Sequence, residues 1–316
     1  MREIIIGSRG SKLALWQSEW VKARLEALDS GVQVRIEIVK TMGDVRLDVP
    51  LSTIGGQGAF TKELEVALLD RRVDVAVHSL KDLPTVTPEG LAITATPERA
   101  DPRDALVLRV GSETQANSLK GLAEGAFVGT SSLRRIAQLK HLRPDVQIKD
   151  VRGNVDTRLR KLDEGEYDAL ILASAGLRRL GFVERISAAI EQEEMLSAVG
   201  QGSLGVETRA DDEETNALVS RLDDPRTRAA VLAERALLRS LGGGCQVPIA
   251  AHATVEGRRL KLDGLVATLD GTQVLRASLD GEAADAARVG EELAARLLER
   301  GAGELLKATP AEVPEG

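Results

Sequence analysis

A chain of 316 residues is long enough for two or three domains. Apolar residues make up 43% of it and aromatic residues only 2%, so its hydrophobic cores must be aliphatic. The net charge of −7 argues against nucleic-acid binding, which normally needs a basic face.

Other whole-chain features exclude further classes of protein. No segment approaches the roughly 18 apolar residues of a membrane span, and the amino-terminal run Ile4 to Ile6 is too short for a signal peptide. Cys245 is the only cysteine, so no intrachain disulfide is possible, and the three histidines are too scattered to form a metal site. These features favour a cytoplasmic protein without a metal.

The first hundred residues alternate between strand and helix patterns. The strands predicted there are residues 4–6, 32–38, 73–77 and 91–95, and the helices are one capped by Ser8 or Ser11 and one at residues 61–72. The first helix is expected to bury the side chains spaced three and four apart, which are Leu13, Trp16, Trp20, Ala23 and Ala27. Repeated strand–helix–strand order predicts an α/β sheet covered on both faces.

A polar linker punctuated by prolines, residues 97–102, leads into a second α/β pattern. Its predicted strands are residues 105–108, 127–128 and 167–173, and its predicted helices are residues 133–142 and 187–197. A glycine-rich connection then enters a strand near Val206. The last part is predicted to hold a helix at 227–241, strands that turn at 256–257 and 270–271, and a closing helix at 283–300.

Arginines recur after the predicted strands. The stretch from Thr130 to Arg135 follows a strand and opens a helix, where free N–H groups favour anions. Further arginines stand between Arg152 and Arg158, at Arg178 and Arg179, and at Arg9. Since ligands of open α/β sheets bind at the carboxyl ends of the strands, these residues predict a polyanion site inside an acidic protein.

Two other stretches are candidates for chemistry. In the loop from His78 to Pro84, Asp82 beside Lys81 is either a surface ion pair or a functional carboxylate placed by a rigid strand. A free cysteine is usually a small buried apolar residue, but three glycines before Cys245 favour an accessible thiol for covalent attachment.

A third pattern is rejected. Residues 200–205 match the dinucleotide pattern G-x-G-x-x-G, which needs a strand before it and a helix after it. A strand pattern follows here instead, so we predict no nucleotide site.

Taken together, the motifs resemble one family, the porphobilinogen deaminases, over nearly the whole chain. The stretches that carry the resemblance are residues 7–14, 55–60, 78–84, 129–135, 152–158, 199–205 and 243–248. They stand in the family's order and spacing. Two positions depart from it: Gln57 stands where many members have lysine, and Gly242 replaces a common glutamate.

The resemblance implies an α/β fold with two periplasmic-binding-protein-like doubly wound domains and a smaller α+β domain with an open-faced antiparallel sheet. Domain 1 is expected to comprise residues 1–98 and 200–221, domain 2 residues 103–197, and domain 3 residues 224–316. Domain 1 is expected to carry the aspartate loop, domain 2 the arginines, and domain 3 the cysteine.

The resemblance also implies an activity. A dipyrromethane cofactor is tied to Cys245, four porphobilinogen molecules are added head to tail with loss of ammonia, and water releases hydroxymethylbilane for haem and porphyrin biosynthesis. The substrate is a small molecule, neither nucleic acid nor membrane is a partner, and the family suggests a monomer. Each pyrrole carries two carboxylates, so the growing chain brings about a dozen of them to guanidinium groups that match their geometry.

Site residues follow by position. Asp82 matches the catalytic aspartate, which stabilises the azafulvenium cation formed when ammonia leaves. The cofactor-binding positions are matched by Cys245, Lys81, Ser132, Arg134, Arg135, Asn154 and Arg158. The substrate-binding positions are matched by Arg9, Ser11, Arg152, Arg158, Arg179 and Gln201.

Three other functions are weighed against this one. An anion-binding module would have the same arginines but no attached pyrroles. A transferase that uses a phosphate donor would need a phosphate loop, which is not found. An oxidoreductase would depend on the rejected glycine pattern.

Overall fold

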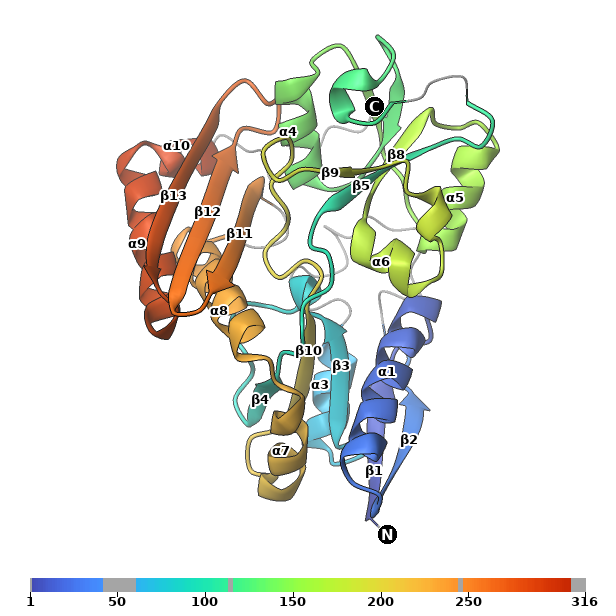
Figure 1. Ribbon diagram of the computed structural model, residues 1–316, viewed down its shortest axis with the longest axis vertical. Coiled ribbons are helices and arrows are strands. Elements are labelled where there is room, and N and C mark those ends of the chain that lie inside the picture. Colours follow the sequence, from blue (N-terminus) through green and yellow to red (C-terminus); the bar gives the residue numbers. More distant parts are fainter. Residues whose placement is uncertain (1, 42–60, 113–115, 244–246, 308–316) are drawn as a thin grey trace. The chain divides into compact units, whose positions relative to one another are not determined.

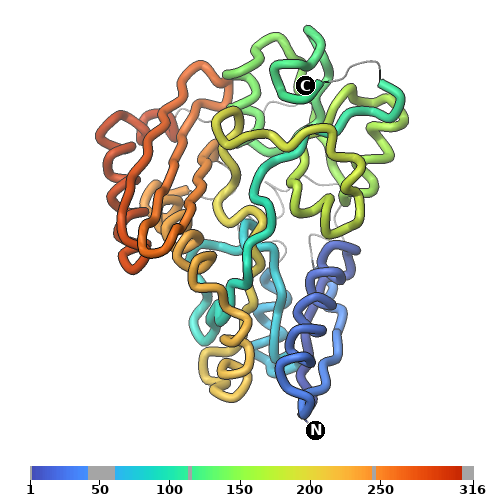
Figure 2. The backbone as a smooth tube through the Cα atoms, viewed as in Figure 1, coloured from blue at the N-terminus to red at the C-terminus, as the bar shows by residue number. Residues whose placement is uncertain are grey.

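The structure is a computed structural model that describes residues 2–41, 61–112, 116–243 and 247–307 (Figure 1). The chain divides into two compact units, Met1–Ala100 with Gly202–Arg228, and Asp101–Gln201 with Ala229–Gly316. Figure 2 traces the backbone through them. Among the described residues, no helix is long and apolar enough to cross a membrane.

The first unit contains a five-stranded sheet in the order β2-β1-β3-β10-β4. Its strands are β1 (Arg2–Ser8), β2 (Val32–Ile38), β3 (Val75–Ser79), β4 (Leu91–Ala95) and β10 (Leu204–Arg209). Strands β2, β1 and β3 are parallel, whereas β10 runs antiparallel to both β3 and β4. Among its described residues, the unit has the α-helices α1 (Lys12–Leu28), α3 (Lys62–Leu69) and α7 (Glu213–Val219).

Helices cover both faces of this sheet. Alternate residues of β1 face opposite sides, so Ile4 and Ile6 pack with Val21 and Leu25 of α1 while Ile5 packs with the cluster around α3. Burial on both faces explains the continuous apolar run Ile4–Ile6 of β1, whereas the edge strand β2 alternates between apolar and polar residues.

The buried face predicted for the first helix is wrong. The residues of α1 that are buried are Ala14, Gln17, Ser18, Val21 and Leu25. Trp16 is 36% exposed, and Trp20 is half-buried with the Arg24 guanidinium 3.8 Å from its ring centroid. Gln17 belongs to the inner face because its Nε2 donates a hydrogen bond of 2.9 Å to Ser79 Oγ at the end of β3. The buried face is therefore shifted by one residue from the predicted one, and it packs Val21 and Leu25 against the sheet.

The sheet of the second unit has the order β7-β6-β8-β5-β9. Its strands are β5 (Asp104–Leu108), β6 (Phe127–Gly129), β7 (Gln147–Lys149), β8 (Ala169–Ala173) and β9 (Ala188–Ile190), and its α-helices are α4 (Leu133–Leu142), α5 (Val155–Asp163) and α6 (Ser174–Arg179). Strand β5 is antiparallel to β8 and β9. Both sheets thus share one order and one antiparallel fourth strand, which confirms two similar doubly wound domains of the periplasmic-binding-protein type.

The helix predicted for residues 187–197 is also wrong. Residues Ala188–Ile190 form β9, which pairs with Asp104 to Leu106 of β5, and turns follow it. Tertiary pairing at the edge of the sheet overrides the local helical preference of this stretch.

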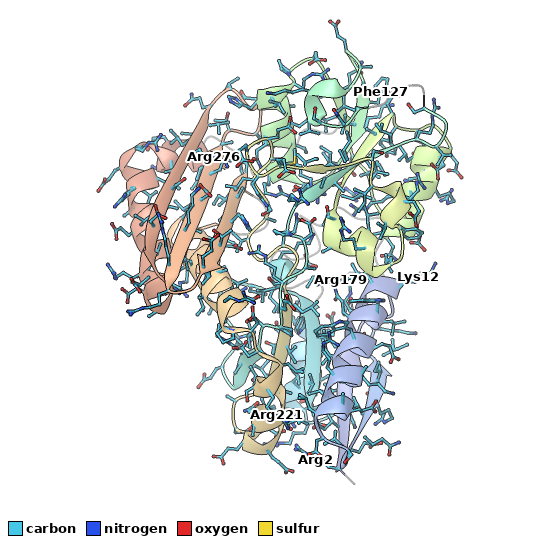
Figure 3. All side chains as sticks on the ribbon, viewed as in Figure 1. Arg2, Lys12, Phe127, Arg179, Arg221 and Arg276 are labelled. Atoms are coloured by element: carbon cyan, nitrogen blue, oxygen red, sulfur yellow. The ribbon has the colours of Figure 1, made fainter. Side chains whose placement is uncertain are left out.

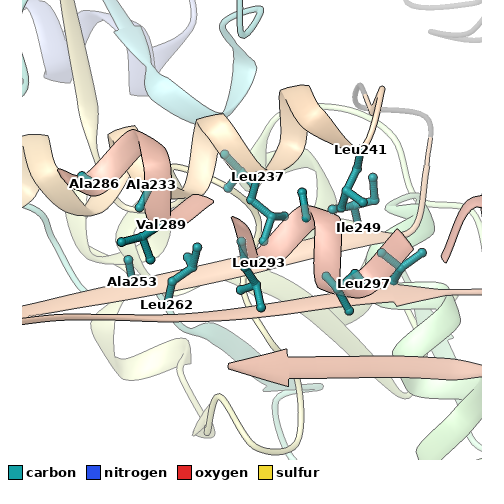
Figure 4. Close-up of a cluster of buried hydrophobic side chains, with 14 of the residues drawn as sticks. Ala233, Leu237, Leu241, Ile249, Ala253, Leu262, Ala286, Val289, Leu293 and Leu297 are labelled. Carbon is teal, nitrogen blue, oxygen red and sulfur yellow. The ribbon is translucent and has the colours of Figure 1, made fainter. Parts of the chain in front are cut away.

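A three-stranded antiparallel sheet, β11-β12-β13, completes the second unit. Its elements are α8 (Pro225–Ser240), β11 (Ile249–Glu256), β12 (Arg259–Ala267), β13 (Val274–Glu282), α9 (Ala286–Glu299) and α10 (Ala302–Lys307). Leu237 of α8, Leu262 of β12 and Leu293 of α9 lie in one aliphatic core on the helix-covered face (Figure 4). The hairpin positions and the closing helix agree with the sequence prediction.

The hairpin between β12 and β13 docks on α4. His141 Nδ1 lies 2.9 Å from the Gly271 carbonyl oxygen. Gly271 has a φ of +73°, and a Cβ there would lie 2.6 Å from the backbone nitrogen of His141. Gly257, in the neighbouring hairpin, has a φ of +58° and nothing within 4 Å of such a Cβ. Both glycines have a positive φ, but only Gly271 lies against the backbone of α4.

This pair of glycines gives a matched test of the docking. We expect Gly257→Ala to lower the free energy of unfolding by about 1–2 kcal/mol, the usual cost of a left-handed alanine. Gly271→Ala should lose about 1–3 kcal/mol more, because the added methyl group collides with the backbone of α4. Urea denaturation of both variants measures the difference, and equal losses would contradict the docking contact.

Candidate cofactor and substrate site

Four predicted site residues of the first unit stand at one edge of its sheet. Arg9 follows β1, and Ser11 caps α1 by accepting a hydrogen bond of 3.3 Å from the Ala14 backbone N–H. Lys81 and Asp82 follow β3 in a 3₁₀ turn, Leu80–Asp82. Because β1 and β3 are adjacent and parallel, their carboxyl ends bring these side chains to the same edge.

The turn that carries Asp82 is held firmly in place. The Leu80 N–H donates to the Ser203 carbonyl (3.0 Å), and the Leu83 N–H donates to the Leu80 carbonyl (3.2 Å). Leu80 and Leu83 are buried while Asp82 between them is exposed. A Cβ on Gly205 would lie 2.9 Å from both leucine side chains, so the turn packs directly on β10. The arrangement presents a fixed carboxylate to solvent.

A buried polar pair that sequence reasoning missed lies beneath this turn. His78 Nε2 is 3.0 Å from Glu207 Oε2, and both side chains are buried. Burial also raises the pKa of Glu65, and the nearby negative charge of Glu207 adds to that rise. No pattern marks Glu207, because its facing partner becomes evident only when β10 pairs with β3.

The arginines of the second unit form a buried cluster at the amino end of α4. Arg134 Nη1 donates to Asp104 Oδ2 (2.7 Å) and to the Leu196 carbonyl (2.8 Å). Arg135 donates to Asp104 Oδ1 through Nε (3.1 Å) and Nη2 (2.7 Å), and to the Ile171 carbonyl through Nη1 (2.8 Å). Burial alone would raise the pKa of Asp104, but the two guanidinium groups outweigh it and hold that pKa far below its usual range.

Gln201 joins the same cluster. Its Nε2 donates to Asp104 Oδ1 (2.9 Å) and to the Pro102 carbonyl (2.7 Å), and the residue is 1% exposed. The structure therefore brings Arg134, Arg135 and Gln201 together through Asp104, a residue that the sequence did not single out.

Arg158 lies near this cluster. Its Nε donates to the Gly153 carbonyl (2.8 Å). Burial lowers the pKa of Arg158, and the nearby positive charge of Arg135 lowers it further. Asn154 stands at the N-cap position of α5 and is exposed, without a side-chain capping bond. Residues that follow β6 and β7 thus converge at one edge of the second sheet.

The remaining predicted residues of this edge differ in exposure. Ser132 is half-buried at the N-cap position of α4, without a side-chain capping bond. Arg152 is exposed and its Nε donates to Asp150 Oδ2 (2.8 Å). Arg179 ends α6 (Figure 3), and burial lowers the pKa of its guanidinium to about 10.

The cluster suits a carboxylate ligand. Two buried guanidinium groups share one carboxylate, and Nε of Arg134 is buried without a hydrogen-bond partner among the described residues. Such excess positive charge is costly to bury unless an anion completes it. The acetate and propionate groups of a dipyrromethane fit this donor set. Within the described ranges no three metal-binding side chains come together.

Four other features named from the sequence are Cys245, Gln57, Gly242 and the glycine pattern at residues 200–205. Cys245 and Gln57 lie outside the described residues. Gly242 follows α8, where its N–H donates to the Arg239 carbonyl (3.0 Å). Residues 200–205 lead into strand β10 rather than into a helix, as the sequence predicted.

Comparison with known families agrees with the resemblance. The family model "Porphobilinogen deaminase, dipyromethane cofactor binding domain" matches residues 4–217, and "Porphobilinogen deaminase, C-terminal domain" matches residues 228–299. In fold, a TRAP periplasmic solute binding protein from Desulfovibrio salexigens is a distant neighbour, with 14% identity, a TM-score of 0.41, and coverage of 70% of this chain and 72% of that one. The strand orders of the two five-stranded sheets, and not this neighbour, define the α/β fold of the chain.

Relatives named porphobilinogen deaminase align over almost the whole chain. The Syntrophobacter fumaroxidans protein is 51% identical over 309 residues, which is 97% of each chain. The Pelotomaculum thermopropionicum protein is 53% identical over 306 residues, 97% of this chain and 96% of that one. These matches show that the chain belongs to the porphobilinogen deaminase family, transferases of tetrapyrrole biosynthesis, and that it contains the family's dipyrromethane-cofactor-binding domain.

Proposed function

We propose that this protein condenses four porphobilinogen molecules head to tail onto a dipyrromethane cofactor, with loss of one ammonia at each step. Water then releases hydroxymethylbilane. The observation that carries the proposal is the buried arginine cluster around Asp104, which has more positive than negative charge and lies within the family's cofactor-binding domain.

The cofactor carboxylates are assigned to the side chains of the second unit and to Lys81. The set comprises Arg134, Arg135, Arg158, Ser132, Asn154 and Lys81, with covalent attachment at Cys245. When bound, the cofactor supplies the pyrrole carbon to which the first substrate unit is joined. Buried guanidinium groups suit this task because they bind carboxylates through two parallel hydrogen bonds.

Asp82 is assigned to the reacting centre. When the aminomethyl group of porphobilinogen leaves as ammonia, positive charge spreads onto the pyrrole nitrogen. A carboxylate held on a fixed turn accepts a hydrogen bond from the pyrrole N–H and stabilises that charge without reorganising. At ~4 Å and an effective dielectric of ~20 the attraction is about 4 kcal/mol, which is roughly a thousandfold in rate.

Substrate carboxylates are assigned to Arg9, Ser11, Arg152, Arg158, Arg179 and Gln201. Of these assignments, Arg179 has the strongest physical support, because burial lowers the pKa of its guanidinium. A desolvated cation gains more from a carboxylate than a hydrated cation does.

A plain anion-binding module is the second candidate function. Two doubly wound domains with arginines at their ligand edges favour it as well. Covalently bound pyrroles distinguish the two candidates, because a receptor has no use for them. Ehrlich's aldehyde reagent, which stains attached pyrroles, should colour the purified protein if it is the enzyme.

Organisation and location complete the proposal. We place domain 1 at residues 1–98 and 200–221, domain 2 at 103–197 and domain 3 at 224–316, one for each of the three sheets. We propose a monomer that acts in the cytoplasm, which suits a chain with a single cysteine.

Asp82→Asn tests the catalytic assignment. The variant should fold and carry the cofactor but lose roughly a thousandfold in kcat, because an amide carries no negative charge. Steady-state kinetics and intact mass measure both properties. Asp211→Asn is the matched control, since Asp211 is an exposed aspartate of the same unit that pairs with Arg71. Near-normal turnover of Asp82→Asn would remove Asp82 from the reacting centre.

Cys245→Ser tests the attachment. The wild-type protein should have an intact mass greater than that of its polypeptide by one dipyrromethane, and the variant should have the polypeptide mass alone. A serine hydroxyl lacks the nucleophilicity of a thiolate. An unmodified mass for active wild-type protein would contradict the attachment.

Arg179→Gln tests the substrate assignment. Its KM for porphobilinogen should rise about tenfold or more, the usual scale for loss of a charged hydrogen bond. Its free energy of unfolding should also lose the pH dependence that the lowered pKa of Arg179 gives the wild type. Because the pKa of Arg179 is lower in the folded than in the unfolded protein, its charge lowers the free energy of unfolding of the wild type below about pH 10. That loss of stability diminishes as the pH rises above about 10, where the folded protein releases the proton.

The adjacent Arg178→Gln is the control, because Arg178 is exposed. It should change neither KM nor the pH dependence of unfolding. Equal effects of the two variants on KM would count against a specific role for Arg179.

A further inference from the structure

Asp104 holds a position that no sequence motif assigns to it. It is the first residue of β5, and it pairs with Ala173 of β8 and with Ile190 of β9. Because β5 runs antiparallel to β8, its first residue lies at the edge where the parallel strands end. Asp104 is 0% exposed, so its carboxylate is fully removed from water.

Four N–H groups converge on this carboxylate. Oδ2 accepts from Arg134 Nη1, and Oδ1 accepts from Arg135 Nε, Arg135 Nη2 and Gln201 Nε2. The carbonyls of Leu196 and Ile171 accept further bonds from the two arginines. Each guanidinium group is thereby fixed by a carboxylate and a carbonyl, which leaves it little freedom to rotate.

The fixed arginines still have capacity for a ligand. Nε of Arg134 is buried and has no hydrogen-bond partner in the described part of the chain. One carboxylate does not neutralise two guanidinium groups, and the amino end of α4 adds the positive end of its dipole. Asp104 therefore orients the pair without cancelling its attraction for an anion.

We propose that Asp104 is a positioning residue of the cofactor site, which holds Arg134 and Arg135 in the orientation that binds the carboxylates of dipyrromethane. This inference rests on the function proposed above. Asp104 touches neither substrate nor reacting atoms, and it acts through the two arginines.

The same carboxylate also fixes the chain that returns from the second sheet. Gln201 is the last residue of the second unit before the chain re-enters the first. Leu196 is bound twice more, through its carbonyl to Gln138 Nε2 (3.0 Å) and through its N–H to Gln138 Oε1 (2.8 Å). The returning segment and the arginines thus share one anchor, and displacing Asp104 should disturb both.

The alternative is that Asp104 merely neutralises charge for the sake of stability. The two roles predict opposite signs for ligand binding. Removing a negative charge makes the cluster more positive, so a purely electrostatic site would bind carboxylates at least as tightly as before. A positioning role predicts weaker binding in spite of that added attraction, because misplaced donors lose their geometry.

Asp104→Asn in the full-length protein separates these roles. The measurements are the thermal unfolding midpoint, cofactor occupancy by intact mass, and KM and kcat for porphobilinogen. We expect lower occupancy, and in the loaded fraction a kcat/KM about 10–100-fold lower through a raised KM. The control is Asp145→Asn, which removes the same charge from an aspartate bound to Arg143 Nε (2.7 Å) beyond the other end of α4, and it should leave occupancy and KM unchanged.

Full occupancy with an unchanged or lower KM would overturn the proposal, even if the unfolding midpoint falls. If Asp104→Asn does not fold, Asp104→Glu replaces it, because that variant keeps the charge and displaces the oxygens by one methylene group. Reduced occupancy of Asp104→Glu supports positioning, and normal occupancy and KM refute it. Absence of Ehrlich-reactive pyrrole from the wild type and from Asp145→Asn would instead refute the proposed function itself.

Discussion

Burial of unequal charge is the constraint on which the arginine-rich end of this molecule depends. Two guanidinium groups lie in the protein interior against a single carboxylate, Asp104, which is itself shielded from water. Such an arrangement is stable only when every donor has a partner or an anion arrives to complete it. Backbone carbonyls at Leu196 and Ile171 supply part of that compensation. In the function proposed above, the carboxylates of the cofactor would supply the rest. The cluster therefore carries excess positive charge before any ligand binds.

The sheet topology makes this arrangement possible. In a purely parallel sheet only residues that follow strands reach the ligand edge, whereas an antiparallel strand brings its first residue there. Strand β5 uses that opportunity to place Asp104 among the arginines. Strand β10 does the same in the other sheet, where Leu204 pairs with Ser79 beside the turn that carries Asp82. Each ligand edge is thus assembled from residues that precede one strand and follow others.

Sequence reasoning succeeded where local signals were strong and failed where pairing decided the outcome. The bounds of β4 and α4 were predicted to the residue, and the arginine positions followed from their place after strands. Asp104 was missed because the direction of β5 cannot be read from its residues. The error at 187–197 has the same origin, since β9 exists only by pairing with β5. In α1 the predicted face was wrong because two apolar series fit helical spacing, and the buried one, Ala14, Val21 and Leu25, is not the one that holds the tryptophans.

The split of the first sheet has a consequence for how the chain folds. Strands β3 and β4 do not pair with each other, because β10 lies between them and stands about a hundred residues later in the sequence. The second sheet, by contrast, is made from one continuous stretch, Asp104–Ile190. As the chain leaves the ribosome, all strands of the arginine-bearing sheet are available before β10 has been synthesised. Until then β3 and β4 lack the strand that lies between them. Unpaired edges attract other chains, so the first hundred residues are exposed to aggregation until β10 has been synthesised.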